Sequence, residues 1–197
     1  MKKTILALAL LSTNAFAGPS GKTTVPPPPP PPACSISYDF VEAGYGHIWG
    51  DDDADADGAY FTFSKSITGN LFGFVEASQY WADDVDFFSA DAGLGFHLPL
   101  TPCIDWAIKG AVVYDKVESS DEVWSGIAST GLRIAAAPWL EVNAFYNIFF
   151  EDFDRSVNGG TLAFIFPSVI APKVDLVAAG VVTEDGEAVT LGVRYNF

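Results

Sequence analysis

Residues 188–197 read Ala-Val-Thr-Leu-Gly-Val-Arg-Tyr-Asn-Phe and alternate between two kinds of side chain over their whole length. The first set is apolar or aromatic and comprises Val189, Leu191, Val193, Tyr195 and Phe197. The second set is small or polar and comprises Ala188, Thr190, Gly192, Arg194 and Asn196. Successive side chains of a strand point to opposite faces, so this stretch predicts one apolar and one polar face. About ten alternating residues are what a tilted strand needs to cross a bilayer.

The same alternation recurs upstream, in residues 88–98, 104–116 and 140–150. In each case apolar residues share one face, and Ser, Asp, Asn, Lys or Gly share the other. A soluble barrel would bury its apolar face, whereas a membrane barrel turns that face toward lipid. We therefore expect an all-β, transmembrane, antiparallel up-and-down barrel, with a soluble secreted barrel or sandwich as the alternative.

Two kinds of connection separate the predicted strands. Four are short and carry turn residues, at 68–70, 101–103, 137–139 and 171–173. Five are acidic, at 51–57, 83–84, 118–122, 151–154 and 184–187. Nine connections imply ten strands, at 36–49, 59–67, 71–81, 87–98, 104–117, 124–136, 140–150, 161–169, 174–183 and 188–197. Eight strands are the alternative if the segments near Leu71 or Pro167 do not span, since proline lacks a ladder donor.

The N-terminal residues predict export. Lys2 and Lys3 precede a short apolar core and small residues ending at Ala17, so residues 1–17 are expected to be a cleaved signal peptide. Residues 18–34 contain an unbroken proline run and are expected to be a periplasmic tether, and residues 35–197 the barrel. Cys34 and Cys103 are an even pair in an exported chain, which favours a disulfide over two free thiols.

The formal net charge of −15 excludes a nucleic-acid partner, because phosphates would be repelled. Strand parity also places charges inside the barrel. These lumen residues are Glu42, Glu76, Asp91, Asp105, Lys109, Arg133, Glu141, Asp175 and Arg194. Buried charges must be paired or solvated, so they form either a plug of ion pairs or a narrow wet path that prefers cations. Arg133 and Arg194 are the cations expected to be paired.

Two further sites are hypotheses. Asp53, Asp55 and Asp57 repeat oxygen ligands at every second residue, as a calcium loop begins, but position twelve is Ser64 instead of Glu. The metal assignment thus stays open between solvated loops and a loop-bound Ca²⁺ or Mg²⁺. No other cofactor is expected, and divalent ions could bridge the acidic loops to lipopolysaccharide phosphates. His47 and His97 are the only histidines, and no serine motif or carboxylate pair accompanies them, so no enzyme is expected.

The sequence also resembles a family. The ending Val193-Arg194-Tyr195-Asn196-Phe197 resembles the assembly signal of bacterial outer-membrane barrels, carried by Tyr195 and Phe197. Residues 38–46 and the turn at 67–71 resemble small barrels of the OmpA-like and porin-like superfamily. The resemblance implies insertion by the outer-membrane assembly machinery. Outer-membrane lipid and lipopolysaccharide are the other expected partners, and the barrel is expected to be a monomer. An even strand count places both termini in the periplasm.

The sequence thus predicts a structural outer-membrane barrel with at most a narrow, cation-preferring pore. A small diffusion porin is the second hypothesis, and an enzyme or adhesin acting at the outer loops is the third.

Overall fold

A computed structural model of the chain describes residues 34, 36–50, 55–82, 86–117, 122–151, 155–183 and 186–197. The residues expected to form the signal peptide and most of the tether lie outside these ranges, as does Asp53. Within the described residues, no helix is long and apolar enough to cross a membrane.

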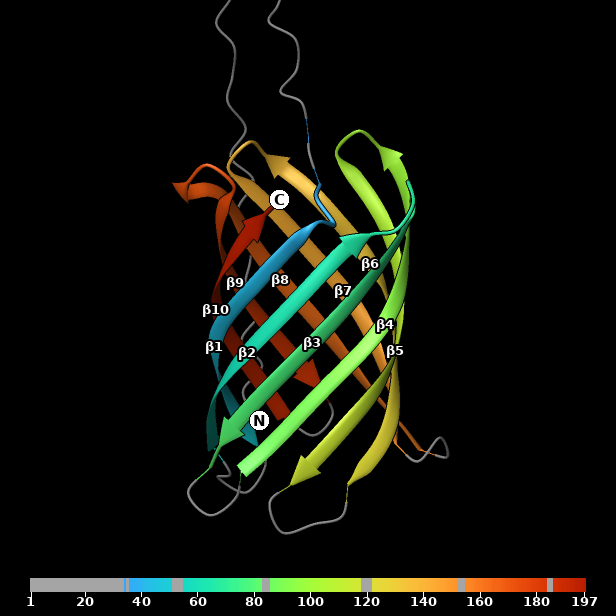
Figure 1. Cartoon of the computed structure of the whole chain (residues 1–197), viewed down its shortest axis with the longest axis vertical. Coiled ribbons are helices and arrows are strands. Elements are labelled where there is room, and N and C mark those ends of the chain that lie inside the picture. The colour runs from blue at the N-terminus through green and yellow to red at the C-terminus, as the bar shows by residue number, and fades with distance from the viewer. Residues whose placement is uncertain are drawn as a thin grey trace, which may run out of the picture. The chain divides into compact units, whose positions relative to one another are not determined.

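Ten antiparallel strands form one closed barrel (Figure 1). They are β1 (Phe40–Gly50), β2 (Asp55–Ser66), β3 (Leu71–Trp81), β4 (Asp86–Thr101), β5 (Ile104–Val117), β6 (Val123–Ala137), β7 (Leu140–Glu151), β8 (Arg155–Ala171), β9 (Val174–Thr183) and β10 (Gly186–Asn196). Each strand pairs with its neighbours in sequence, and β1 closes the barrel against β10. The predicted ten-stranded up-and-down barrel is confirmed, and the eight-stranded alternative is wrong because β3 and β8 both take their places in the wall.

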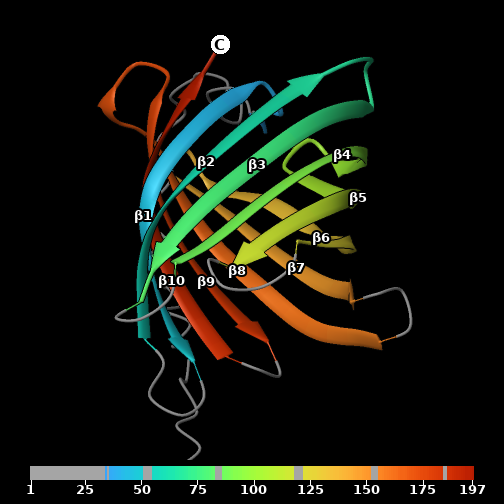
Figure 2. The ribbon, with the colours of Figure 1, turned by 60° about the horizontal axis from the view of Figure 1, so that its bottom comes forward.

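The two ends of the barrel differ. We call the end that carries the four short turns, at 67–70, 102–103, 138–139 and 172–173, the turn end. Phe40, the first residue of β1, and Phe197 also lie at this end, where Phe197 N donates to Asp39 O at 3.2 Å. The opposite end, which we call the loop end, receives the other five connections. The strands cross the wall obliquely between the two ends (Figure 2).

Pro167 lies at an irregularity of the ladder, as its missing donor requires. Register between β8 and β9 is lost between Phe166 and Ala171, and Ser168 has a φ of 56°. The backbone N of Ser168 then donates to Asp175 Oδ1 at 2.9 Å, so a side chain of β9 replaces the missing strand partner.

The prediction for the first strand is wrong at its start. Residues 36–39 alternate like a strand, but the strand begins at Phe40. Asp39 instead accepts the Ser66 backbone N–H at 2.7 Å, and Tyr38 is buried with only 6% of its surface exposed. These contacts bend the segment away from the wall.

Candidate functional site: the charged lumen

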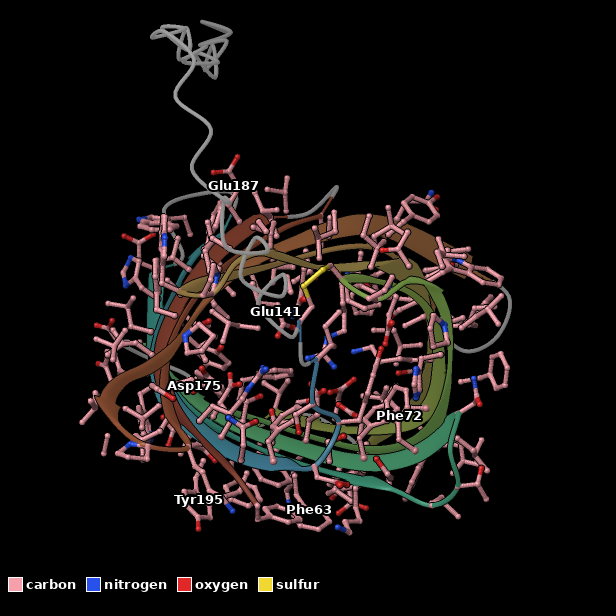
Figure 3. The ribbon with its side chains drawn as sticks, turned by 90° about the horizontal axis from the view of Figure 1, so that it is seen from above. Phe63, Phe72, Glu141, Asp175, Glu187 and Tyr195 are labelled. Carbon is pink, nitrogen blue, oxygen red and sulfur yellow. A yellow bond between two sulfur atoms is a disulfide. The ribbon has the colours of Figure 1, made fainter. Side chains whose placement is uncertain are left out.

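The candidate site is the interior of the barrel. Alternate residues of each strand point into it, and many of them are polar or charged. Looking down the barrel, Phe72, Glu141 and Asp175 point inward, whereas Phe63 and Tyr195 point outward (Figure 3). Among the described side chains, seven inward carboxylates face three inward cations. The carboxylates are Glu42, Glu76, Asp91, Asp105, Asp115, Glu141 and Asp175, and the cations are Lys109, Arg133 and Arg194.

Arg133 and Glu141 form a buried ion pair near the turn end. Arg133 Nη2 and Nε lie 2.6 and 2.9 Å from Glu141 Oε1, and both residues are about 5–6% exposed. The strands β6 and β7 meet at a short turn, so these two side chains reach one another across one ladder. The guanidinium also lies 4.3 Å from the centre of the Tyr38 ring. A charge buried to this degree needs such partners to offset its desolvation.

Tyr38 joins this pair to residues of β3, β4 and β5. Its hydroxyl donates to Asp105 Oδ2 at 3.2 Å, and its ring stacks on His97 at 4.2 Å between centroids. The Phe72 ring lies 4.6 Å away. Burial raises the pKa of the Tyr38 hydroxyl, so it remains a donor at neutral pH.

Arg194 and Glu42 form the second buried pair. Arg194 Nε and Nη2 both lie 2.7 Å from Glu42 Oε2, and Tyr60 donates to the other carboxylate oxygen at 2.9 Å. In the strand registers, Arg194 lies directly opposite Glu42 on one side and Asp175 on the other. Asp175 is occupied by hydrogen bonds from Ser168 N and from Asn196 Nδ2, the latter at 2.6 Å.

The middle of the lumen is less well neutralised. Lys109 Nζ lies 4.0 Å from Glu76 and between two aromatic rings, 5.3 Å from the centre of Phe74 and 5.2 Å from that of Phe145. Glu76 and Asp91 are directly opposite one another in the β3–β4 register, and Asp91 Oδ1 is buried with no hydrogen-bond partner among the described residues. Carboxylates thus outnumber cations among the described side chains in the middle of the lumen.

A cavity of about 460 Å³ runs along this interior. Its lining includes Glu76, Asp91 and Lys109 in the middle of the lumen, and Tyr38 and Arg133 toward the turn end. The cavity does not reach Asp105, His97 or Glu141, which lie beyond Tyr38 and Arg133. Tyr38 and Arg133 therefore narrow the space inside the barrel near the turn end.

Two residues of the proposed calcium loop, Asp55 and Asp57, are described, whereas Asp53 lies outside the described residues. Asp55 and Asp57 lie in β2, and Asp57 Oδ1 lies 2.9 Å from His47 Nδ1 across the β1–β2 ladder. Among the described residues, no three His, Cys, Asp or Glu side chains are grouped to hold a metal ion. His47 contacts the Trp49 ring edge-on, on the outward face.

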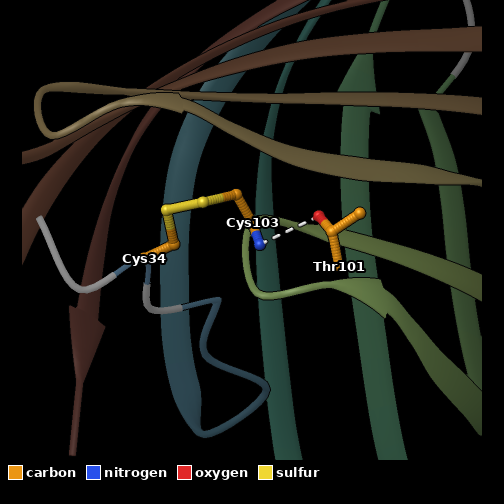
Figure 4. The surroundings of a disulfide bond; sticks show 3 residues. All are labelled: Cys34, Thr101 and Cys103. Atoms are coloured by element: carbon orange, nitrogen blue, oxygen red, sulfur yellow. Dashed lines mark hydrogen bonds between the residues drawn. A yellow bond between two sulfur atoms is a disulfide. The ribbon is translucent and has the colours of Figure 1, made fainter. Parts of the chain in front are cut away.

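The predicted disulfide is present. Cys34 and Cys103 are bonded, with their Cα atoms 5.0 Å apart, at the turn end of the barrel (Figure 4). Thr101 Oγ1 accepts the Cys103 backbone N–H at 3.2 Å and orders the β4–β5 turn around the bond.

Tyr195 and Phe197 both lie on the outward face, 46% and 44% exposed. Phe197 stacks on Phe63 with 6.0 Å between centroids, and Lys65 Nζ lies 4.7 Å from the Phe197 ring.

Sequence analysis missed three contributors to the site. Asp115 lies on the inward face of β5, and the alternation of 104–116 contained the signal for it. His97 and Tyr38 were not recognised as part of a lumen cluster. The sequence pattern indicated less about these two residues than about Asp115, because only the closed barrel brings β1, β4 and β5 to one mouth.

No known family model matches the chain, and no curated protein matches it. Solved structures match at the level of the barrel. A KdgM porin in complex with disordered oligogalacturonate is 5% identical, with a TM-score of 0.45 over 80% of this chain and 99% of that one. Neisserial surface protein A is 14% identical, with a TM-score of 0.44 over 82% and 98% of the two chains. The outer membrane protein OprG from Pseudomonas aeruginosa is 12% identical, with a TM-score of 0.45 over 84% and 98%.

Proposed function

We propose that this chain is a structural β-barrel of the bacterial outer membrane, with at most a narrow, cation-preferring path through its lumen. The proposal rests on one observation: apolar side chains lie on the outside of the barrel and charged side chains on the inside, the reverse of a soluble protein. Leu191, Trp124 and Val112 on the outside are 55–65% exposed, whereas Arg133, Glu141 and Arg194 on the inside are 5–7% exposed. In water this arrangement would leave a large apolar surface uncovered, and a bilayer covers it.

Aromatic residues at both ends of the barrel support a membrane position. Trp49, Trp81 and Trp124 lie near the loop end, and Trp106 and Trp139 near the turn end, and all five are at least 36% exposed. Two such bands suit the two membrane interfaces, where an amphipathic ring contacts both lipid and water.

The proposed orientation places the turn end in the periplasm and the acidic loops outside. It includes cleavage after Ala17, a periplasmic tether at 18–34 and insertion by the assembly machinery, as the resemblance of Tyr195 and Phe197 implies. Divalent ions between the acidic loops and lipopolysaccharide are part of the same proposal.

A fractionation and labelling experiment tests membrane location and orientation. The full chain, expressed with its own N-terminal segment, is expected to sediment with outer membranes and to resist alkaline extraction. A Ser119→Cys variant, in an acidic connection, should react with an impermeant maleimide on whole cells, whereas Thr68→Cys, in a turn, should react only after permeabilisation. A chain found in the soluble periplasmic fraction would overturn the proposal, and the reverse labelling pattern would overturn its orientation.

A small diffusion porin is the second candidate, and the 460 Å³ cavity favours it. The two candidates differ in the turn-end mouth, which a porin must leave open to solutes.

A further inference from the structure

We propose that Tyr38 is a plug that narrows the turn-end mouth of the lumen, and that the Cys34–Cys103 disulfide is the strap that holds it there. The inference rests on the proposed function for its membrane setting and adds to it a narrow state that reduction widens.

The path of the chain carries the first step. Cys34 lies six residues before β1, yet it is bonded to the turn between β4 and β5, three strands away around the barrel. Ile36 packs against the buried cluster of Tyr38, Phe72 and Phe74, so this part of the segment faces the lumen. Figure 3 shows the disulfide lying over the barrel mouth.

The contacts of Tyr38 carry the second step. Its backbone oxygen accepts a 2.7 Å hydrogen bond from Ser64 of β2, and its ring contacts Phe72 of β3 and His97 of β4. Its hydroxyl bonds Asp105 of β5, and Arg133 of β6 lies over the ring. The side chain thus contacts β3, β4, β5 and β6, and the backbone oxygen adds β2. Tyr38 also lines the cavity.

The disulfide can hold Tyr38 in place because Tyr38 lies outside the hydrogen-bonded ladder of the strands. Residues 36–39 precede β1, and their fixed contacts are at Tyr38 and Asp39. The disulfide keeps the segment near its slot and so removes much of the entropic cost of docking it. Reduction by an external dithiol transfers two electrons and two protons, gives Cys34 and Cys103 thiols, and leaves the reductant as its own disulfide. The segment is then held from one end only.

Conductance of the refolded full chain in planar bilayers tests the plug. Tyr38→Ala is expected to raise the unit conductance roughly two-fold or more, because the ring that fills the neck is gone. Tyr38→Phe keeps the ring and loses only the bond to Asp105, so it should stay close to wild type. Tyr45→Ala, which removes an outward tyrosine of β1 that is 54% exposed, is the matched control.

Reduction tests the strap. Dithiol treatment of wild type should increase conductance in the same direction as Tyr38→Ala, and a Cys34→Ser/Cys103→Ser variant should show the increase without reductant and no response to it. Folded mobility on gels is checked for each variant first. Unchanged conductance in Tyr38→Ala overturns the plug, and an unchanged reduced wild type overturns the strap. An opened Tyr38→Ala channel that prefers anions would uphold the plug while overturning the cation preference of the proposed function.

Discussion

Arg194 is 7% exposed, and the carboxylate of Glu42 offsets the cost of burying its charge inside the barrel. Breaking such a pair costs more than the pair itself contributes, because the remaining charge stays buried without compensation. Glu42 would keep one hydrogen bond, from Tyr60, after loss of Arg194.

Arg194→Ala is therefore expected to destabilise the barrel by about 3–5 kcal/mol. The double variant Arg194→Met/Glu42→Leu should recover much of that loss, since it removes both charges. Urea unfolding in lipid vesicles, followed by gel mobility, measures both. A double variant as unstable as the single one would show that the ion pair is not the source of the loss.

Asp39, which lies outside the spanning strands, should make the stability of the protein depend on pH. A hydrogen bond from the Ser66 backbone, with Lys65 3.4 Å away, lowers the pKa of Asp39 below its usual value. A lowered folded-state pKa gives stability that is present above the unfolded pKa of about 3.8 and is lost as pH falls through the folded pKa.

Asp39→Asn removes this charge and keeps an acceptor oxygen. We expect wild type to be more stable than the variant at neutral pH, and the difference to shrink as the pH falls below about 4. Paired unfolding curves across this range measure it. A difference that is the same at pH 7 and pH 3 would contradict the assignment.

Close packing between neighbouring strands depends on glycine residues that leave room for an aromatic ring on the next strand. Phe72 of β3 lies directly opposite Gly95 of β4, and a Cβ at Gly95 would overlap the Phe72 ring. That ring is 4% exposed and contacts Tyr38, so it has little room to move.

Gly95→Ala is expected to cost about 1–3 kcal/mol through this overlap. Gly110→Ala on β5 is the matched control, because its nearest neighbour to an added Cβ is a backbone oxygen 3.9 Å away. Its effect should be close to zero. Equal losses in the two variants would place the cost in the glycine backbone and not in the packing on Phe72.

The strands themselves were predictable from the sequence because a slip of one residue exchanges the two faces. Alternation was clear in residues 88–98, 104–116, 140–150 and 188–197, and turn residues marked the four short connections. Strand ends were less predictable. Residues 36–39 alternate as a strand does, and only contacts with Ser64, Asp105 and Arg133, distant in sequence, turn them into the mouth. β2 likewise begins at Asp55, inside a stretch that its acidity marked as loop.

The inward charges of the site were likewise predictable from parity, but their partners were not. Lys109 shows why, since its neighbours Phe74 and Phe145 come from β3 and β7, on strands that only barrel closure brings together.

We expect the balance of charge along the lumen to decide the ion preference of the whole barrel. Lys109 is the one cation among the described inward side chains near Glu76, Asp91 and Asp115. Lys109→Met should shift the reversal potential in a salt gradient further toward the cation value, as the acids lose their counter-charge. Lys116→Met, on the same strand but 52% exposed beside Glu122, should leave it unchanged. A shift toward the anion value in Lys109→Met would contradict the assigned role of the acids.

The proposed membrane barrel has an apolar outside and a charged, narrow, acidic inside. Single-channel recording of the refolded wild-type chain across a potassium chloride gradient tests this arrangement. We expect small unit steps whose reversal potential has the sign of cation preference. Large unit steps, or a reversal potential of the anion sign, would contradict it.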